Sequence, residues 1–134
     1  MTKFVNRRDL EFVLYELLKL ETFCTWERFS EHDRQTFDGV LDTAMAIARD
    51  HFAPHARMLD EHEPEFKDGG VELPDEIRQA IGAYVDSGLM RAHLDFDEDG
   101  MQLPSVVVQA AIGMMYAANV STAGYPLLTA GAAN

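Results

Sequence analysis

Apolar side chains recur at spacings of three and four residues in four segments of the chain: 8–23, 30–52, 73–88 and 105–119. This spacing places the apolar residues on one face of a helix, so each segment is predicted to be helical. No stretch of useful length alternates apolar and polar residues as a strand would. The pattern predicts an all-α fold with bundle-like packing of four helices. A short fifth helix is possible in residues 122–134, interrupted by Pro126.

Several residues signal where these helices begin and end. Ser30 and Asp33 have the spacing of a capping box, which predicts the start of the second helix. Pro54 is expected to end or kink that helix, because proline donates no amide hydrogen and crowds the preceding turn. Pro74, followed by two acids, suits the first turn of the third helix, and Gly88 suits its end.

Two polar stretches, residues 55–73 and 90–104, are predicted to be long loops. The helix that follows them, 105–119, is apolar on nearly all sides and should therefore be buried on nearly all sides. Its Gly113 indicates a close contact with another helix. A chain of this size has few elements to cover such a helix, so we expect an interface there. The alternative is that the first three helices cover it.

Length, charge and cysteine content limit the number of domains, the possible partners and the expected location of the protein. The 134 residues are enough for one domain spanning 1–134. A net charge of -12 argues against a nucleic-acid partner, because phosphates repel an acidic surface. The longest apolar run, 106–118, is too short to cross a bilayer, and no apolar signal core begins the chain. Cys24 is the only cysteine, so a reducing, cytoplasmic location without a membrane is expected.

One acidic segment resembles the opening of a calcium-binding EF-hand loop. Residues 95–100 place carboxylates at alternate positions before Gly100, which would allow a sharp turn. The twelfth position, where a bidentate glutamate should close the site, is Val106. A solvated acidic loop with a turn at Gly100 is therefore the favoured interpretation, and calcium binding is a weaker alternative.

Two histidines, His51 and His55, have the four-residue spacing of zinc ligands on a helix. Pro54 lies between them and disturbs the regular geometry that zinc requires. We expect exposed histidines at a helix end and no metal. Cys24 has no histidine near it in the sequence to act as a base, so a packing role is expected for it.

Several strings resemble the acyl-CoA dehydrogenase family, in particular a large bacterial subgroup. The first is FVNRRDLEFVLYELL at residues 4–18, with an aromatic residue, a basic-Asp pair, Phe-Val-Leu and an acidic-Leu pair. Others follow in the family's order, at residues 52–54, 69–74, 84–89, 118–121 and 125–132. Each string is short, but their order and spacing cover nearly the whole chain.

The resemblance implies the N-terminal helical domain of an FAD-dependent enzyme that oxidises the Cα–Cβ bond of an acyl-CoA. In that family a glutamate removes the α proton while FAD accepts a hydride from Cβ. The middle β domain and the C-terminal helical domain, which bind FAD and supply the glutamate, have no counterpart in residues 1–134. No catalytic, cofactor-binding or metal residue is therefore expected here, and FAD is expected only in the full-length enzyme.

The resemblance also implies that the last helices of this domain wall the acyl pocket. The corresponding residues are Asn119, Ser121, Thr122 and Tyr125. Implied partners are the remaining domains, the acyl-CoA substrate and further copies in a homo-oligomer. The family's Tyr-Gly-Gly-x-Gly turn before Leu-Pro is replaced by acids at 97–99 with one glycine. Those acids would repel the anionic CoA and argue against conventional substrate binding.

A second hypothesis places the chain in a different class. It is a free-standing helical protein-interaction module derived from the same domain, which binds a protein partner and catalyses nothing. Whether the coding sequence continues beyond Asn134 would separate the two hypotheses. Acyl chain length, electron acceptor and oligomeric state are not encoded in any motif of these residues.

Overall fold

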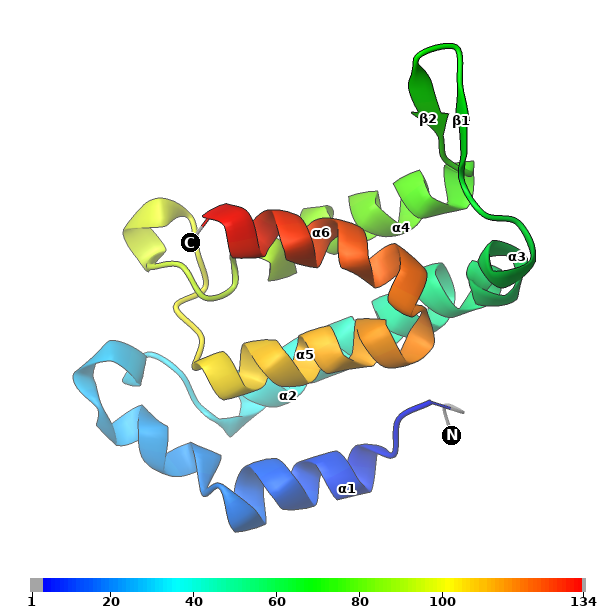
Figure 1. Ribbon diagram of the computed structural model, residues 1–134. Helices are drawn as coiled ribbons and strands as arrows, with labels where there is room; N and C mark the ends of the chain where they lie inside the picture. The colour runs from blue at the N-terminus through cyan, green and yellow to red at the C-terminus, as the bar shows by residue number, and fades with distance from the viewer. Residues whose placement is uncertain (1–3, 134) are drawn as a thin grey trace.

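The computed structural model describes residues 4–133, which form an all-α domain with one small hairpin (Figure 1). The α-helices are α1 (Arg7–Glu11), α2 (Arg34–Ile47), α3 (Ala56–Glu61), α4 (Asp75–Asp86), α5 (Ser105–Ala118) and α6 (Val120–Ala133). The strands are β1 (Glu65–Lys67) and β2 (Gly70–Glu72). The all-α prediction is confirmed for these residues, although two α-helices more than the basic four are present.

The predicted first helix is shorter than its apolar pattern suggested. α1 is capped by the Asn6 side chain, which accepts a hydrogen bond from the Arg8 amide, and continues as a π-helical segment, Phe12–Leu17. Lys19 then has a φ of 53°, which ends the helical run, and two 3-10 turns follow. Because this segment lies at the edge of the domain, much of its apolar stripe is exposed, and Leu17 retains 65% of its accessible surface.

The second helix begins four residues later than predicted. Asp33 is its N-cap: its carboxylate accepts a hydrogen bond of 2.8 Å from the Thr36 amide. Ser30 instead donates to the carbonyl of Glu27, so the predicted capping box is wrong. Beyond Ile47 the helix continues as a π-helical turn and then a 3-10 turn that contains Pro54. This change of helix type accommodates the missing proline donor, as such turns often do.

Residues 55–73, predicted to be a loop, contain α3 and the β1–β2 hairpin. The strands pair antiparallel, with Phe66 opposite Val71, and the hairpin projects from the body of the domain (Figure 1). Asp68 and Gly69 form its turn, both with positive φ of 51° and 83°. An Asp-Gly pair is the sequence signal for such a turn, because it tolerates left-handed backbone at both positions.

The later helices largely match their predictions. α4 ends where Gly88 adopts a φ of 80°, a conformation that favours glycine, so the predicted stop is confirmed. α5 begins directly after Pro104. The chain then turns at Asn119 into α6, a full helix of 14 residues rather than a short one. Pro126 lies inside α6 without ending it.

The core lies where α2 and α5 pack against each other, with α4 and α6 covering them (Figure 1). Its largest fully buried side chains include Phe37 and Leu41 on α2, Phe52 beyond it, Tyr84 on α4 and Met114 on α5. These side chains come from every part of the chain between α2 and α5. The core therefore depends on contacts between segments that are distant in sequence.

Much of the apolar surface of the 105–119 helix, for which an interface was expected, is covered within the chain. Its apolar residues, among them Val107, Ala111 and Met115, are buried against α2 and α6. The tail helix, and not the first three helices alone, supplies the cover. Gly113 is exposed, and a Cβ added there would meet nothing within 4 Å, so it marks no close helix contact.

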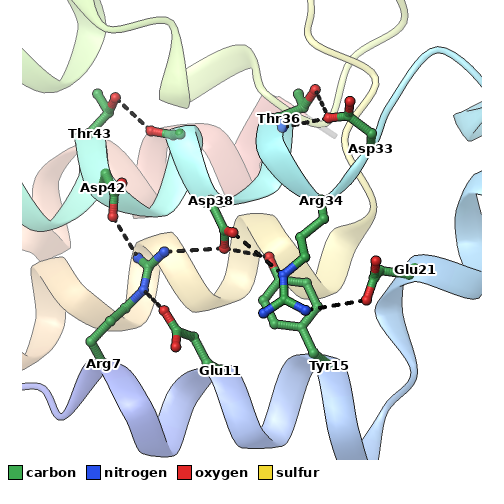
Figure 2. A network of polar contacts seen from close by, with 11 residues as sticks. Arg7, Glu11, Tyr15, Glu21, Asp33, Arg34, Thr36, Asp38, Asp42 and Thr43 are labelled. Carbon is green, nitrogen blue, oxygen red and sulfur yellow. Dashed lines mark hydrogen bonds and ion pairs between the residues drawn. The ribbon is translucent and has the colours of Figure 1, made fainter.

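A polar network joins the N-terminal segment to α2 (Figure 2). Asp38 accepts hydrogen bonds from Arg7 (3.3 Å) and from the Tyr15 hydroxyl (2.7 Å), and it forms an ion pair with Arg34. The Arg34 guanidinium also lies over the Tyr15 ring, 4.0 Å from its centroid. Burial and the neighbouring Asp38 carboxylate raise the pKa of Tyr15. This network, together with the buried Leu14, holds the otherwise exposed helix in place.

Among residues 4–133, no helix combines the length and the apolar character needed to cross a membrane.

Candidate functional site

The predicted pocket residues gather at the junction of α5 and α6, where Asn119 is almost completely buried. Its side-chain amide donates to the carbonyl of Phe52 (3.0 Å), and its side-chain oxygen accepts from the Thr122 amide (3.1 Å). The second bond is the N-cap of α6, because it satisfies an amide of the first helical turn. Asn119 therefore orients α6 and connects its start to Phe52, at the end of the π-helical turn that continues α2.

Thr122 is fully buried and contacts a histidine that sequence reasoning placed on the surface. Its hydroxyl lies 2.8 Å from Nε2 of His55. His55 is only 5% exposed, so the expectation of an exposed histidine is wrong for this residue. Burial lowers the pKa of His55, although the Glu76 carboxylate acts in the opposite direction. The neutral ring is thus favoured in the folded protein.

We expect folding stability to fall as pH is lowered through the ordinary titration range of histidine, about pH 6.5. The unfolded chain takes up a proton there that folded His55 resists, so stability rises with pH across this range. Each pH unit contributes at most about 1.4 kcal/mol. Chemical unfolding of wild type and His55→Gln between neutral and mildly acidic pH checks this. Parallel curves for the two proteins would contradict it.

Ser121 and Tyr125 differ from the other two predicted residues, because both are exposed on α6. On one side they face α3 and the following loop, where Leu59 and Pro64 complete a hollow of about 240 Å³. On the outer side they border a second, shallow hollow of about 380 Å³ on α6 itself. Of the four predicted residues, these two have side chains available to a ligand.

A larger cleft lies between α4, α5 and α6, and sequence reasoning missed it. Its volume is about 390 Å³. Its apolar lining consists chiefly of Leu89, Met90, Val108, Ile112 and Leu127. None of the four predicted pocket residues lines it. The signal was present in the 105–119 helix, whose apolar residues on all sides include some that face a cleft rather than another helix.

Among residues 4–133, the polar groups of this cleft include no carboxylate, ammonium or guanidinium group. They are contributed by Tyr84, His93, Ser105, Gln109 and Tyr116. Burial raises the pKa of Tyr84 to about 12, so its hydroxyl is protonated at neutral pH. Within the described part of the chain, no Lys, Arg, Asp or Glu lines the cleft. Such a lining suits an uncharged apolar group with a small number of hydrogen-bonding atoms.

The acidic loop at residues 95–100 is held by hydrogen bonds within its own backbone, and two of its carboxylates lie near arginines. Asp95 pairs with Arg28, and Asp99 lies 3.8 Å from Arg91. Among residues 4–133, one group of three acidic side chains is close enough together to hold a metal ion. It consists of Asp95, Asp97 and Glu98, whose possible ligand atoms lie within 4.8 Å of one another. The residue at the closing position of an EF-hand, Val106, is in the first turn of α5. The geometry supports the solvated-loop interpretation better than calcium binding.

The other candidate residues are Cys24, His51 and His55, and their surroundings favour structural roles. Cys24 is partly buried against the core, and burial raises the pKa of its thiol, as a packing role predicts and a reactive thiolate does not. His51 and His55 both border a hollow with Asp50 and Glu76. Nε2 of His55 is hydrogen-bonded to the Thr122 hydroxyl, and the group of three possible metal ligands found among residues 4–133 includes neither histidine.

The fold and the cleft define a helical domain that can enclose an apolar group. No known protein-family profile matches the sequence. The chain is 27% identical over 125 residues to 3-methylmercaptopropionyl-CoA dehydrogenase from Ruegeria pomeroyi. The aligned region covers 93% of this chain but 21% of that enzyme, so the chain spans about one fifth of its relative's length. This similarity suggests the acyl-CoA dehydrogenase family.

Proposed function

We propose that this chain is the N-terminal helical domain of an FAD-dependent acyl-CoA dehydrogenase, which helps to wall the acyl pocket and packs against the rest of the subunit. The observation that carries the proposal is the similarity to an acyl-CoA dehydrogenase along 93% of the chain. The all-α architecture and the ordered strings at residues 4–18 and 125–132 support it. The reaction would be oxidation of the Cα–Cβ bond of an acyl-CoA, completed by domains outside these residues.

The cleft between α4, α5 and α6 supports an acyl-binding role. Its apolar lining would accept the hydrocarbon part of an acyl group, and Ser105, Gln109 and Tyr116 offer hydrogen bonds at few positions. The relative's name indicates a small thioether acyl group, 3-methylmercaptopropionyl, and a cleft of about 390 Å³ has room for a group of that kind. Ser121 and Tyr125 would extend the wall on the outer side of α6, while Asn119 and Thr122 would hold that helix in position.

A flavin dinucleotide does not fit the cleft that we assign to the acyl group. Its diphosphate requires basic side chains or a set of free backbone amides. No Arg or Lys lines the cleft in the described residues, and the chain as a whole carries a net charge of -12. We therefore assign FAD to the full-length enzyme and to none of the described residues, and no step of the reaction to this chain alone.

A binding measurement tests the proposal directly. We expect the chain to bind a short acyl-CoA weakly, and Ile112→Trp, which fills the cleft, to weaken that binding by about tenfold or more. Isothermal titration calorimetry with butyryl-CoA, and with free CoA for comparison, provides the measurement. Val85→Trp is the matched control, because Val85 is an exposed residue of α4 outside the cleft. Absence of binding, or equal binding by all three proteins, would count against an acyl site.

The alternative function, a free-standing helical interaction module, is favoured by one observation. The outer side of α6 carries exposed apolar residues and no charged residue. Such a module would bind a protein partner and show no preference for acyl-CoA over free CoA. The same calorimetric comparison therefore separates the two functions.

A further inference from the structure

Tyr84 on α4 is deeply buried, yet its hydroxyl group has no partner in the chain. The residue retains 2% of its accessible surface. Its carbonyl oxygen accepts a hydrogen bond from the Ser87 hydroxyl (2.6 Å), but among residues 4–133 no group bonds to its phenolic oxygen. Tyr15, the other buried tyrosine, donates its hydroxyl to Asp38 (2.7 Å). Because a buried tyrosine hydroxyl usually has such a partner, the hydroxyl of Tyr84 indicates a partner outside the chain.

This hydroxyl reaches the cleft between α4, α5 and α6. In the described part of the chain it is not among the side-chain polar atoms that are both sealed from solvent and unbonded. The hollow that Tyr84 borders is this cleft of about 390 Å³. Since the hydroxyl is neither sealed off nor bonded, its partner comes from whatever occupies the cleft.

Burial divides the lining of the cleft into a floor and a rim. Tyr84, Leu89 and Val108 are buried and form the floor, whereas Ser105 and Gln109 are exposed and belong to the rim. A water molecule on the floor would find few polar partners besides Tyr84, because the other two floor residues are apolar. The hydroxyl is therefore placed to meet the end of a ligand that enters the cleft farthest.

The charge of the lining limits what this hydroxyl can bond. Burial raises the pKa of Tyr84 to about 12, so the group keeps its proton at neutral pH and can donate it in a hydrogen bond. A carboxylate beside it would be buried without a countercharge, since no Lys or Arg of the described residues lines the cleft. An ammonium group would likewise find no Asp or Glu among them. The acceptor that remains is an uncharged oxygen of an ether, hydroxyl or carbonyl group.

We propose that the cleft selects acyl groups with an uncharged oxygen near the end of an otherwise apolar tail, and that Tyr84 recognises this oxygen by donating a hydrogen bond. The assignment rests on the proposed acyl site and adds the chemical class of the tail. A hydrocarbon tail of equal length fills the same space but leaves the hydroxyl without a bond, so it binds less tightly. The polar thioester end then lies at the rim, near Ser105 and Gln109.

Three thioesters of N-acetylcysteamine test this assignment without the charged nucleotide of CoA. Their acyl groups are hexanoyl, 3-ethoxypropanoyl and 4-methoxybutanoyl, which have equal length and differ in the presence and position of one ether oxygen. We expect the wild type to bind at least one of the ethers about three- to tenfold more tightly than the hexanoyl thioester, as one additional hydrogen bond predicts. Titrations followed by NMR chemical shifts measure the three affinities.

Two variants, each of which removes one buried hydroxyl, separate recognition from a structural role. Tyr84→Phe should reduce the preference for the ether to less than about twofold, with hexanoyl binding unchanged. It should leave the urea midpoint of unfolding unchanged or raised, because no bond within the chain is lost. Tyr15→Phe is the matched control with the opposite pattern: it should keep the preference, since Tyr15 is outside the cleft, and lower the midpoint, since it loses the bond to Asp38.

Several results would overturn the assignment. They are equal affinities for the three thioesters, no binding of any of them, or a preference for the ether that survives Tyr84→Phe. A lower urea midpoint for Tyr84→Phe would also overturn it, because the hydroxyl would then be bonded within the chain. The proposed function can fail separately: if the ether is preferred but no acyl-CoA binds, the acyl-CoA dehydrogenase role is wrong and oxygen recognition is retained. If acyl-CoA binds and no ether is preferred, only oxygen recognition fails.

Discussion

Replacing Gly100 by alanine is expected to lower the free energy of unfolding by about 2–4 kcal/mol. A Cβ at this position would overlap the carbonyl group and the Cβ of Leu94. The loop cannot easily open to make room, because the Gly100 amide donates to the carbonyl of Asp95 (2.9 Å) and the Gln102 amide donates to that of Leu94 (2.8 Å). Urea unfolding followed by circular dichroism measures the change.

Gly82→Ala provides the control for this experiment. Gly82 lies inside α4, and an added Cβ would meet nothing within 4 Å. Alanine should therefore stabilise the protein there by up to about 1 kcal/mol, through helix propensity and a less flexible unfolded chain. If Gly100→Ala behaved like Gly82→Ala, the close approach to Leu94 would not exist in solution.

Asn119→Ala is the second substitution with a large expected effect, a loss of about 2–4 kcal/mol. It removes the N-cap of α6, and it leaves the buried carbonyl of Phe52 without the hydrogen bond from the Asn119 side chain. Thermal and urea unfolding measure this loss. Since α6 covers α5 and contributes Leu127 to the cleft, we also expect the Asn119→Ala variant to bind acyl-CoA more weakly than the wild type.

Ser121→Ala separates a structural role from a direct contact with a ligand. Ser121 is exposed and next to the same cap, so its removal should change stability by less than about 0.5 kcal/mol. If it weakens acyl-CoA binding while stability is unchanged, the outer side of α6 contacts the ligand. If Asn119→Ala also leaves stability unchanged, the capping role derived from the geometry is wrong.

Local sequence signals predicted those features that neighbouring residues control. The apolar spacing predicted the α2, α4 and α5 helices, and Gly88 predicted the end of α4, because its left-handed backbone suits glycine. Two other local predictions are wrong. The Asp68-Gly69 pair forms a hairpin turn within residues predicted to be a loop, and Asp33 rather than Ser30 caps α2, because only Asp33 lies directly before its first turn.

The candidate site could be located only in part. The resemblance drew attention to the junction at Asn119, but the partners of that side chain and of Thr122 are 67 residues away in sequence. The cleft is bordered by Leu89, Ile112 and Leu127, which belong to three separate segments. No spacing within one helix reveals which of its apolar residues face such a space and which face another helix.

The all-α class, the net negative charge and most of the helical segments could be predicted from the sequence, because helix periodicity depends on residues close together in the chain and net charge on composition alone. Which apolar faces are covered depends on the packing of the helices in three dimensions. α5, expected to be covered at an interface, is buried largely because α6 folds back over it, and α6 in turn presents Leu128 to solvent. Burial depends on how separate helices pack, and helices of similar composition can occupy either the covered or the covering position.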